Sequence, residues 1–492
     1  MRLSRLLAEL PGAELQGDPG LEIADVVHDS RRASPGSLFV AVRGRVTDGN
    51  QFAAAARKKG ALVVCSEEPP SGEGTWVRVA DSREALAALS AAIFGFPARS
   101  LELVGVTGTN GKTTTAYLVD SALRAAGETV GLLGTVEYRV GDRIAEAVRT
   151  TPESSDLQAL FREMVDAGCR RAVLEVSSHS LDLKRVHGLE CRVAVFTNLT
   201  RDHLDYHGDM DAYFAAKRLL FERHLRADGH AIVNLDDDRA GEVVRASRGR
   251  AWTYSLEDPR ADLLAEDVRL SLDGTRFRAR TPAGVLEIET PLVGRFNVQN
   301  ALAAIGAGLA LGTAPDAVQR GIASLRGVPG RMERVVAGQD FTVLVNYAHT
   351  DDALKNLLET VRGLKPRRVV TVFGCGGDRD RTKRPLMGAV AARLSDVVIL
   401  TSDNPRSEPP EAILEEIRRG IPAARAADTQ VVPDRRDAIA RALEMGREGV
   451  VVVIAGKGHE PYQVLRERTV PFDDRQVARD VLARLAGAGG RR

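Results

Sequence analysis

The chain has 492 residues, and its 68 Lys and Arg residues nearly balance its 67 Asp and Glu residues, for a formal net charge of +1. This balance gives no overall basic field for holding a nucleic-acid backbone, so nucleic acid is excluded as the main partner. No apolar run approaches the roughly 18 residues of a membrane helix, and residues 1–18 show no signal core. The composition predicts a cytoplasmic protein of about three domains, without membrane insertion.

Two residue types are sparse enough to be informative. Four cysteines are spread along the chain without a CxxC pair: Cys65, Cys169, Cys191 and Cys375. We expect reduced, mostly buried thiols there, not disulfides or a zinc site. Only nine of the 68 basic residues are lysines. Arginine is therefore the general surface cation of this chain. A lysine here more often has a role that depends on its amine than a lysine in a chain of ordinary composition.

The first domain is predicted over residues 1–99. Short strand-like runs at 38–42 and 61–66 alternate with an alanine-rich helical stretch at 83–96, which ends before Pro97. This mixture indicates a small α/β domain.

A second domain is predicted over residues 100–331. Each of its apolar runs leads into polar residues and then a helical pattern; the runs are residues 101–106, 171–178, 192–199 and 230–235. This alternation predicts a parallel sheet covered by helices on both faces. The alternating pattern of residues 262–290 predicts an antiparallel annex. Pro329 and Gly330 mark the predicted boundary with the next domain.

The third domain is predicted over residues 332–492 as a Rossmann-like unit. Three apolar runs end in glycine-rich or polar loops, within residues 367–380, 396–406 and 449–460. Ligands bind beyond the carboxyl ends of such strands, so we predict one binding site shared by these loops. The whole chain is therefore assigned to the α/β class, with three domains.

A glycine- and threonine-rich segment, GVTGTNGKTT, follows the first strand of the second domain at residues 105–114. Glycines let backbone N–H groups approach phosphate, Lys112 can reach the β- and γ-phosphates, and Thr113 can bind Mg²⁺. Val106 stands where the strict GxxxxGK[ST] pattern has glycine. A purely structural turn is the alternative, but GKTT directly after a buried strand favours a nucleoside-triphosphate site.

Acidic and histidine residues gather after the strand run 192–199. They are Asp202, His203, Asp205 and His207. Carboxylates and imidazoles at this edge of a sheet can bind a metal ion or a phosphate, although such residues are also common in solvated loops. Glu175, at the end of another strand run, is a candidate Mg²⁺ ligand.

Lys217 lies on an apolar helical stripe formed by Tyr213, Phe214, Leu220 and Phe221. A lysine in such a stripe often extends its amine to solvent. If the amine is buried instead, its charge requires a partner or a chemical change. The pattern leaves both alternatives open.

Further motifs, read together, resemble the Mur ligases of bacterial cell-wall synthesis. The motifs are GVTGTNGKTTT at 105–115, EVSSH at 175–179, TNLTRDHLDYHG at 197–208, FNVQN at 296–300, GRME at 330–333 and YAHTDDAL at 347–354. Three more are similar to the members that catalyse the third amino-acid addition: FGCGGDRDRTKRP at 373–385, DNPR at 403–406 and AGKGHE at 455–460. Of these, DNPR resembles the version in members that add meso-2,6-diaminopimelate rather than lysine. The resemblance covers nearly the whole chain.

The resemblance implies an ATP-dependent, ADP-forming amide ligase of peptidoglycan precursor synthesis. The γ-phosphate of ATP would go to the D-Glu side-chain carboxylate of UDP-MurNAc-L-Ala-D-Glu, and the amine of meso-2,6-diaminopimelate would attack the acyl phosphate. It also implies UDP-sugar, ATP and amino-acid domains in that order, and Mg²⁺ as cofactor. We expect domain closure during the reaction, because the ATP loop and the amino-acid loops lie on different domains and must meet over one carboxylate, and we expect a monomer.

The resemblance also assigns roles in ATP and metal binding. The implied ATP contacts are Thr109, Asn110, Gly111, Lys112, Thr113, Thr114, Thr115, Asn300 and Arg331. Thr113 and Glu175 would bind a first Mg²⁺, and His203 with carbamylated Lys217 (N6-carboxylysine) a second. Lys112, Glu175, His203 and Lys217 are the implied catalytic residues.

For the UDP-sugar peptide the implied contacts are Ser30, Arg45, Val46, Thr47, Thr150, Thr151, Ser177 and Arg185. For diaminopimelate they are Arg379, Asp403, Asn404, Pro405, Arg406, Gly456 and Glu460. Diaminopimelate differs from lysine by a second carboxylate, which a guanidinium can bind bidentately, so Arg406 is predicted to select it.

The chain departs from the family pattern at three positions. Asn346 and Asp351 stand where the family usually has Asp and Pro, and Leu183 stands where some relatives have Gln. We expect a weakened or rearranged nucleotide contact at Asn346.

Other functions remain as alternatives. The nearest are a lysine-adding Mur ligase and a ligase like folylpolyglutamate synthetase. DNPR and the N-terminal DSR at 29–31 argue against both. A P-loop switch or motor, and a non-catalytic UDP-sugar-binding scaffold, are the alternatives from other classes.

Overall fold

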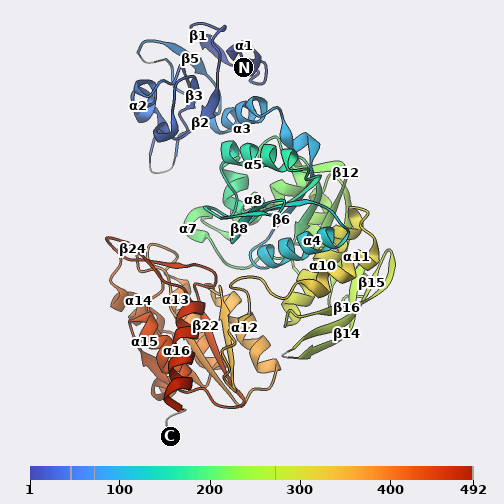
Figure 1. Cartoon of the computed structure of the whole chain (residues 1–492), viewed down its shortest axis with the longest axis vertical. Coiled ribbons are helices and arrows are strands. Elements are labelled where there is room, and N and C mark those ends of the chain that lie inside the picture. The colour runs from blue at the N-terminus through green and yellow to red at the C-terminus, as the bar shows by residue number, and fades with distance from the viewer. Residues whose placement is uncertain (45–46, 71, 272, 490–492) are drawn as a thin grey trace.

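A computed structural model of the chain describes residues 1–44, 47–70, 72–271 and 273–489. Three sheets follow one another along its longest axis, with the N-terminal sheet at one end and the C-terminal sheet at the other (Figure 1). The chain is α/β throughout, as predicted. The predicted domain limits at residues 99 and 331 stay predictions.

The N-terminal sheet has five strands in the order β1-β5-β4-β3-β2. Strands β2 to β5 are parallel to one another, and β1 is antiparallel to β5. Its elements are α1 (Leu3–Leu7), β1 (Glu14–Gln16), β2 (Asp25–Val27), β3 (Ser37–Val40), α2 (Ala53–Lys58), β4 (Val63–Ser66), β5 (Thr75–Arg78) and α3 (Ser82–Ile93). Strands β3 and β4 and helix α3 confirm the predicted elements.

The central sheet has eleven strands in the order β16-β15-β14-β13-β12-β11-β6-β10-β7-β8-β9. Its strands are β6 (Glu102–Thr107), β7 (Val130–Leu133), β8 (Glu137–Val140), β9 (Arg143–Glu146), β10 (Arg171–Glu175), β11 (Cys191–Phe196), β12 (Leu225–Asn234), β13 (Arg250–Ser255), β14 (Leu263–Ser271), β15 (Gly274–Thr281) and β16 (Gly284–Thr290). Its helices are α4 (Lys112–Ala125), α5 (Ser154–Asp166), α6 (Ser178–Asp182), α7 (Leu204–His207), α8 (Met210–Arg223), α9 (Ala240–Ala246), α10 (Arg295–Ala310) and α11 (Pro315–Ser324).

The four predicted strand runs of this domain are confirmed as β6, β10, β11 and β12, which pair in parallel. Strands β14 to β16 are antiparallel to one another, as predicted. They are attached to the parallel part of the sheet, because Leu263 and Leu264 of β14 pair in parallel with Tyr254 and Ser255 of β13. The antiparallel strands therefore extend the same sheet.

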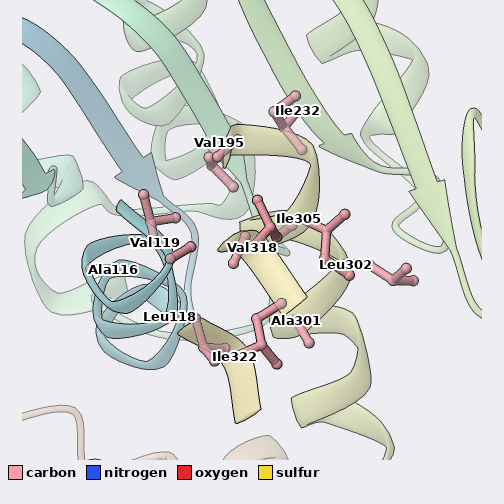
Figure 2. Packing of buried hydrophobic residues seen from close by; sticks show 14 of the residues in the cluster. Ala116, Leu118, Val119, Val195, Ile232, Ala301, Leu302, Ile305, Val318 and Ile322 are labelled. Atoms are coloured by element: carbon pink, nitrogen blue, oxygen red, sulfur yellow. The ribbon is translucent and has the colours of Figure 1, made fainter. Parts of the chain in front are cut away.

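Helices cover both faces of the central sheet because side chains alternate along buried strands. Val104 and Val106 of β6 pack in the cluster with α4, α10 and α11, whereas Leu103 packs in the cluster with α5 and α8. Figure 2 shows the first of these clusters, where side chains of the three helices meet Val195 and Ile232 of the sheet. The packing fixes the start of α4 next to the end of β6.

The C-terminal sheet has six strands in the order β17-β18-β22-β19-β20-β21, all parallel except β17. Its elements are β17 (Glu333–Arg334), β18 (Thr342–Asn346), α12 (Asp351–Gly363), β19 (Arg368–Phe373), α13 (Lys383–Leu394), β20 (Val397–Leu400), α14 (Pro410–Arg418), β21 (Thr429–Val431), α15 (Arg435–Leu443), β22 (Val450–Ala455) and α16 (Asp474–Gly489). A small hairpin, β23 (Tyr462–Val464) and β24 (Thr469–Pro471), follows β22. The predicted runs are β19, β20 and β22, and the sheet order makes them neighbours.

All four cysteines are buried free thiols, as expected from the sequence. Among the described residues, no helix combines the length and the apolar character that crossing a membrane requires.

Candidate active site

The loop between β6 and α4 depends on two glycines. Gly108 and Gly111 have φ of +148° and +87°, in the region that side chains disfavour. A Cβ on Gly108 would lie 1.8 Å from Oγ1 of Thr197, and one on Gly111 would lie 2.4 Å from Oδ1 of Asn300. The backbone therefore passes too close to its neighbours for any other residue, and the first N–H groups of α4 are presented at the end of the sheet.

This loop opens into a cleft of about 940 Å³ between the central and C-terminal domains. The sequence-predicted residues that line it are Thr109, Asn110, Gly111, Lys112, Thr113, Thr114, Thr150, Glu175, Ser177, His203, Lys217, Asn300 and Arg331. The C-terminal domain contributes Asn346, Tyr347, His349 and Asp352 among others. Residues more than 200 positions apart in the sequence thus share one cleft.

The amine of Lys112 bends back over the loop. Its Nζ donates hydrogen bonds to the carbonyl oxygens of Gly108 and Thr109, both at 2.8 Å. Burial lowers the pKa of Lys112, while the carboxylates of Glu175 and Asp202 oppose the shift.

Lys217 is buried, with 1% of the residue exposed. Its Nζ donates to the carbonyl oxygen of Gly108 at 2.7 Å and lies 4.4 Å from the ring centroid of Tyr213. Burial lowers the pKa of Lys217 well below its usual value, and the nearby charge of Lys112 acts in the same direction. Of the two alternatives that the sequence left open, the structure supports the buried amine.

Glu175 is fully buried at the end of β10. Its Oε2 accepts hydrogen bonds from the hydroxyls of Thr113 and Thr135, both at 3.0 Å, and its Oε1 accepts one from the backbone N–H of Thr135 at 2.8 Å. Sequence analysis did not select Thr135, although a polar residue after strand β7 was an available signal. A carboxylate beside two hydroxyls offers the hard oxygen ligands that suit Mg²⁺.

His203 and His349 approach the carboxylate of Asp202 from two domains. The distances from Asp202 Oδ2 to Nε2 of His203 and His349 are 3.4 Å and 3.7 Å. Partial burial lowers the pKa of His203 to about 3, and Lys217 and Lys112 contribute. Asp205 is exposed, and no cluster of three or more His, Cys, Asp or Glu suited to a metal occurs in the described part of the chain.

The remaining ATP candidates lie around α10 and the start of the C-terminal domain. Oδ1 of Asn300 accepts a hydrogen bond from Thr115, which is buried inside α4 and does not line the cleft. Arg331 donates to Oγ1 of Thr113 at 3.2 Å, and its guanidinium lies 4.6 Å from the ring centroid of Tyr347.

The predicted UDP-sugar-peptide residues are spread over two domains. Thr150 and Ser177 line the cleft, whereas Thr151 is buried and donates to the carbonyl of Glu175 at 2.8 Å. Arg185 pairs with Glu153 at 2.8 Å.

Ser30 and Thr47 belong to the N-terminal domain and do not line the cleft. Arg45 and Val46 lie outside the described residues.

The three polar loops of the C-terminal domain meet at one place. We call residues 374–382 the β19 loop, residues 401–409 the β20 loop and residues 456–461 the β22 loop. Asn404 donates to Oε2 of Glu460 at 2.9 Å, and Arg406 donates to the carbonyl of Gly377 at 2.7 Å. Gly456 approaches Asp403 so closely that a Cβ would lie 2.5 Å from its Oδ2.

The seven predicted diaminopimelate residues all lie on these loops, outside the cleft lined by the phosphate loop: Arg379, Asp403, Asn404, Pro405, Arg406, Gly456 and Glu460. Tyr347, which lines the cleft, donates to Oε1 of Glu460 at 3.4 Å and connects the two places.

Lys457 is a residue of this group that sequence analysis did not place in a site. Its Nζ is fully buried and donates to Oδ1 of Asn404 at 3.0 Å and to Oε2 of Glu460 at 3.1 Å. The sequence did contain a signal for Lys457, because lysine is rare in this chain.

Known proteins similar to this chain support one family. Three family models match it: Mur ligase family, catalytic domain, over residues 22–93; Mur ligase middle domain over 106–308; and Mur ligase, glutamate ligase domain, over 330–458.

Relatives named UDP-N-acetylmuramoyl-L-alanyl-D-glutamate–2,6-diaminopimelate ligase are similar over nearly the full length. The protein of Solibacter usitatus is 52% identical over 94% of this chain and 94% of its own, and that of Geobacillus thermodenitrificans is 46% identical over 97% and 99%. A solved structure with this name is 33% identical, with a TM-score of 0.70, over 99% of this chain and 100% of that one. The chain belongs to the Mur ligase family.

Proposed function

We propose that this chain adds meso-2,6-diaminopimelate to the D-Glu side-chain carboxylate of UDP-MurNAc-L-Ala-D-Glu, with ATP as the second substrate. The observation that carries the proposal is the meeting of three neighbouring loops, where Arg406 contacts Gly377 and Asn404 contacts Glu460, next to a cleft that holds a phosphate loop. The names of the relatives support the same substrates.

The chemistry needs an activated carboxylate, because a carboxylate is a poor electrophile at neutral pH. Transfer of the γ-phosphate forms an acyl phosphate, attack of the diaminopimelate amine gives a tetrahedral intermediate, and phosphate leaves. Negative charge grows on the transferred group, and fixed cations stabilise it. Lys112 and Arg331 are the cations of this chain beside Thr113.

We assign Mg²⁺ to the same cleft as cofactor, where it would neutralise phosphate charge. Thr113 and Glu175 would hold one ion, because the Glu175 carboxylate and the Thr113 hydroxyl are 3.0 Å apart. His203 and Lys217 would hold a second. A carbamate on Lys217 would give that position the oxygen ligands that an amine lacks.

Arg406 is the residue we assign to the second carboxylate of diaminopimelate. Lysine presents an ammonium group at the corresponding end, which a guanidinium repels. This contrast makes diaminopimelate the preferred amino acid over lysine.

Phosphate release with UDP-MurNAc-L-Ala-D-Glu, ATP and either amino acid tests the proposal. We expect turnover with diaminopimelate, much less with lysine, and little ATP hydrolysis when either acceptor is missing. Equal turnover of the two amino acids would refute the role of Arg406. Rapid hydrolysis without the UDP-linked acceptor would favour a P-loop switch or motor.

A further inference from the structure

Arg384 is a buried cation that the reaction does not use directly. It lies in the first turn of α13, and its side chain is 0% exposed. Its guanidinium donates two hydrogen bonds to the carboxylate of Glu408, at 2.8 Å and 2.9 Å, and one to the carboxylate of Glu416 at 2.8 Å. A buried guanidinium must be paired with carboxylates in this way. The bidentate pair with Glu408 also fixes the orientation of the two side chains relative to each other.

The Arg384–Glu408 pair joins the β19 and β20 loops. Glu408, on the β20 loop, accepts a hydrogen bond from the backbone N–H of Asp378 at 2.6 Å. Arg384 donates to the carbonyl of Gly376 at 3.2 Å. These two contacts flank Gly377, whose carbonyl oxygen accepts the hydrogen bond from Arg406.

The contact between the two loops is close and conformationally demanding. A Cβ on Gly377 would lie 2.0 Å from the carbonyl oxygen of Pro405. Asp378 and Arg406 have φ of +53° and +51°, which is unfavourable for residues with side chains. Ser407 holds Asp378 through hydrogen bonds from its hydroxyl, at 2.6 Å, and from its backbone N–H, at 3.1 Å. Such a backbone persists only where its surroundings hold it.

We propose that Arg384 and Glu408 are positioning residues that hold the Arg406 guanidinium in place, and that they thereby set the selectivity for an amino acid with a second, distal carboxylate. Neither residue needs to touch the substrate. The inference rests on the proposed function, because it assumes that Arg406 binds that carboxylate.

Glu416 provides a matched control for Glu408. The two side chains are 17% and 18% exposed, and both pair with Arg384. Glu416 lies on α14, however, and its partners among the described residues are Arg381 and Arg384, outside the contact around Gly377. Glu408→Gln and Glu416→Gln therefore remove the same charge from Arg384, and only the first loosens the two loops.

The experiment measures kcat and KM for diaminopimelate, lysine and ATP in the wild type and both variants, with melting temperatures. We expect Glu408→Gln to raise the KM for diaminopimelate about tenfold, because binding groups must be held closely in place. The KM for ATP and the kcat/KM for lysine should stay unchanged, so the preference for diaminopimelate falls about tenfold. Glu416→Gln should keep the wild-type preference.

Arg384→Lys keeps the positive charge but loses the bidentate hydrogen bonds to Glu408. We therefore expect this variant to behave like Glu408→Gln. Equal preference in Glu408→Gln and Glu416→Gln would overturn the inference, as would a fall in activity that is the same for both amino acids. The amino-acid preference of the wild type is measured before any variant is made. If the wild type does not prefer diaminopimelate, that result contradicts the proposed function itself.

Discussion

Arg201 connects the central domain to the C-terminal domain. Its guanidinium lies 3.0 Å from the carboxylates of both Asp351 and Asp380, and it donates to Oγ1 of Thr382 at 2.7 Å. Asp351 is one of the positions where this chain departs from the family pattern. The contact therefore joins a family motif, TNLTRDHLDYHG, to a position where this chain lacks the usual family residue.

The free energy of this contact depends on how exposed its side chains are to solvent. The side chains of Arg201, Asp351 and Asp380 are 26%, 23% and 13% exposed, so solvent screens the pairs in part. Pairs of this kind contribute about 0.2–1 kcal/mol each. Replacing Asp351 should weaken the docking of the two domains by about 0.5 kcal/mol, and replacing Arg201 by about 1–2 kcal/mol, because two facing carboxylates then lose their cation.

A double-mutant cycle on kcat/KM for ATP measures this coupling. We expect Arg201→Ala to lower it about tenfold and Asp351→Asn about twofold, with the double variant no worse than Arg201→Ala. Asp351→Pro, which restores the usual family residue, should resemble Asp351→Asn, because proline is tolerated at the first position of a helix such as α12. High salt should reduce the loss of kcat/KM in each of the three single variants.

The control is Arg260→Ala, which removes an exposed ion pair with Asp258 inside the central domain and should leave kcat/KM unchanged. Additive effects of Arg201→Ala and Asp351→Asn, or losses that are equal at low and high salt, would refute the reasoning.

Three other predictions concern the central domain. Gly108→Ala should destabilise the fold by about 1–3 kcal/mol in denaturant unfolding, since its Cβ would meet Thr197; Gly127→Ala, with positive φ but open space, should lose only about 1 kcal/mol. Burial lowers the pKa of His224 below 6.5, so the unfolded chain binds the proton more readily; stability should fall as the pH drops below about 6.5, and His224→Gln should flatten that slope. Lys217→Met should keep or raise the melting temperature while ligase activity is lost; an active variant would contradict the carbamate.

Much of the fold could be predicted from the sequence because its strands are buried on both faces. Such strands read as unbroken apolar runs, and the runs that became β6, β10, β11 and β12 are of this kind. The meeting of the three C-terminal loops followed from the same reasoning, since parallel strands end at one edge. Strand β14 was harder to interpret: it is parallel to one neighbour and antiparallel to the other, and a periodicity of two does not distinguish these.

Parts of the candidate site depend on tertiary contacts that no local pattern records. Arg201 meets Asp351 across 150 positions of the chain, and Thr135 reaches Glu175 across 40. Arg384 resembles any other surface arginine in this arginine-rich sequence, yet it is fully buried. Only the packing of α13 against the loops makes its pairing necessary.

Lys217 shows how the structure narrows a choice that the sequence leaves open. Lys112 and Lys217 both donate to the carbonyl of Gly108, at 2.8 Å and 2.7 Å, so a partly buried amine and a fully buried one share one acceptor. Two positive charges there would repel each other, and burial penalises both, which favours a neutral amine at Lys217. A neutral amine is the form that adds CO₂, and the resulting carbamate would be an anion beside Lys112. The modification we propose would therefore replace repulsion by attraction, and would change the formal net charge from +1 to −1, because one cation is lost and one anion gained.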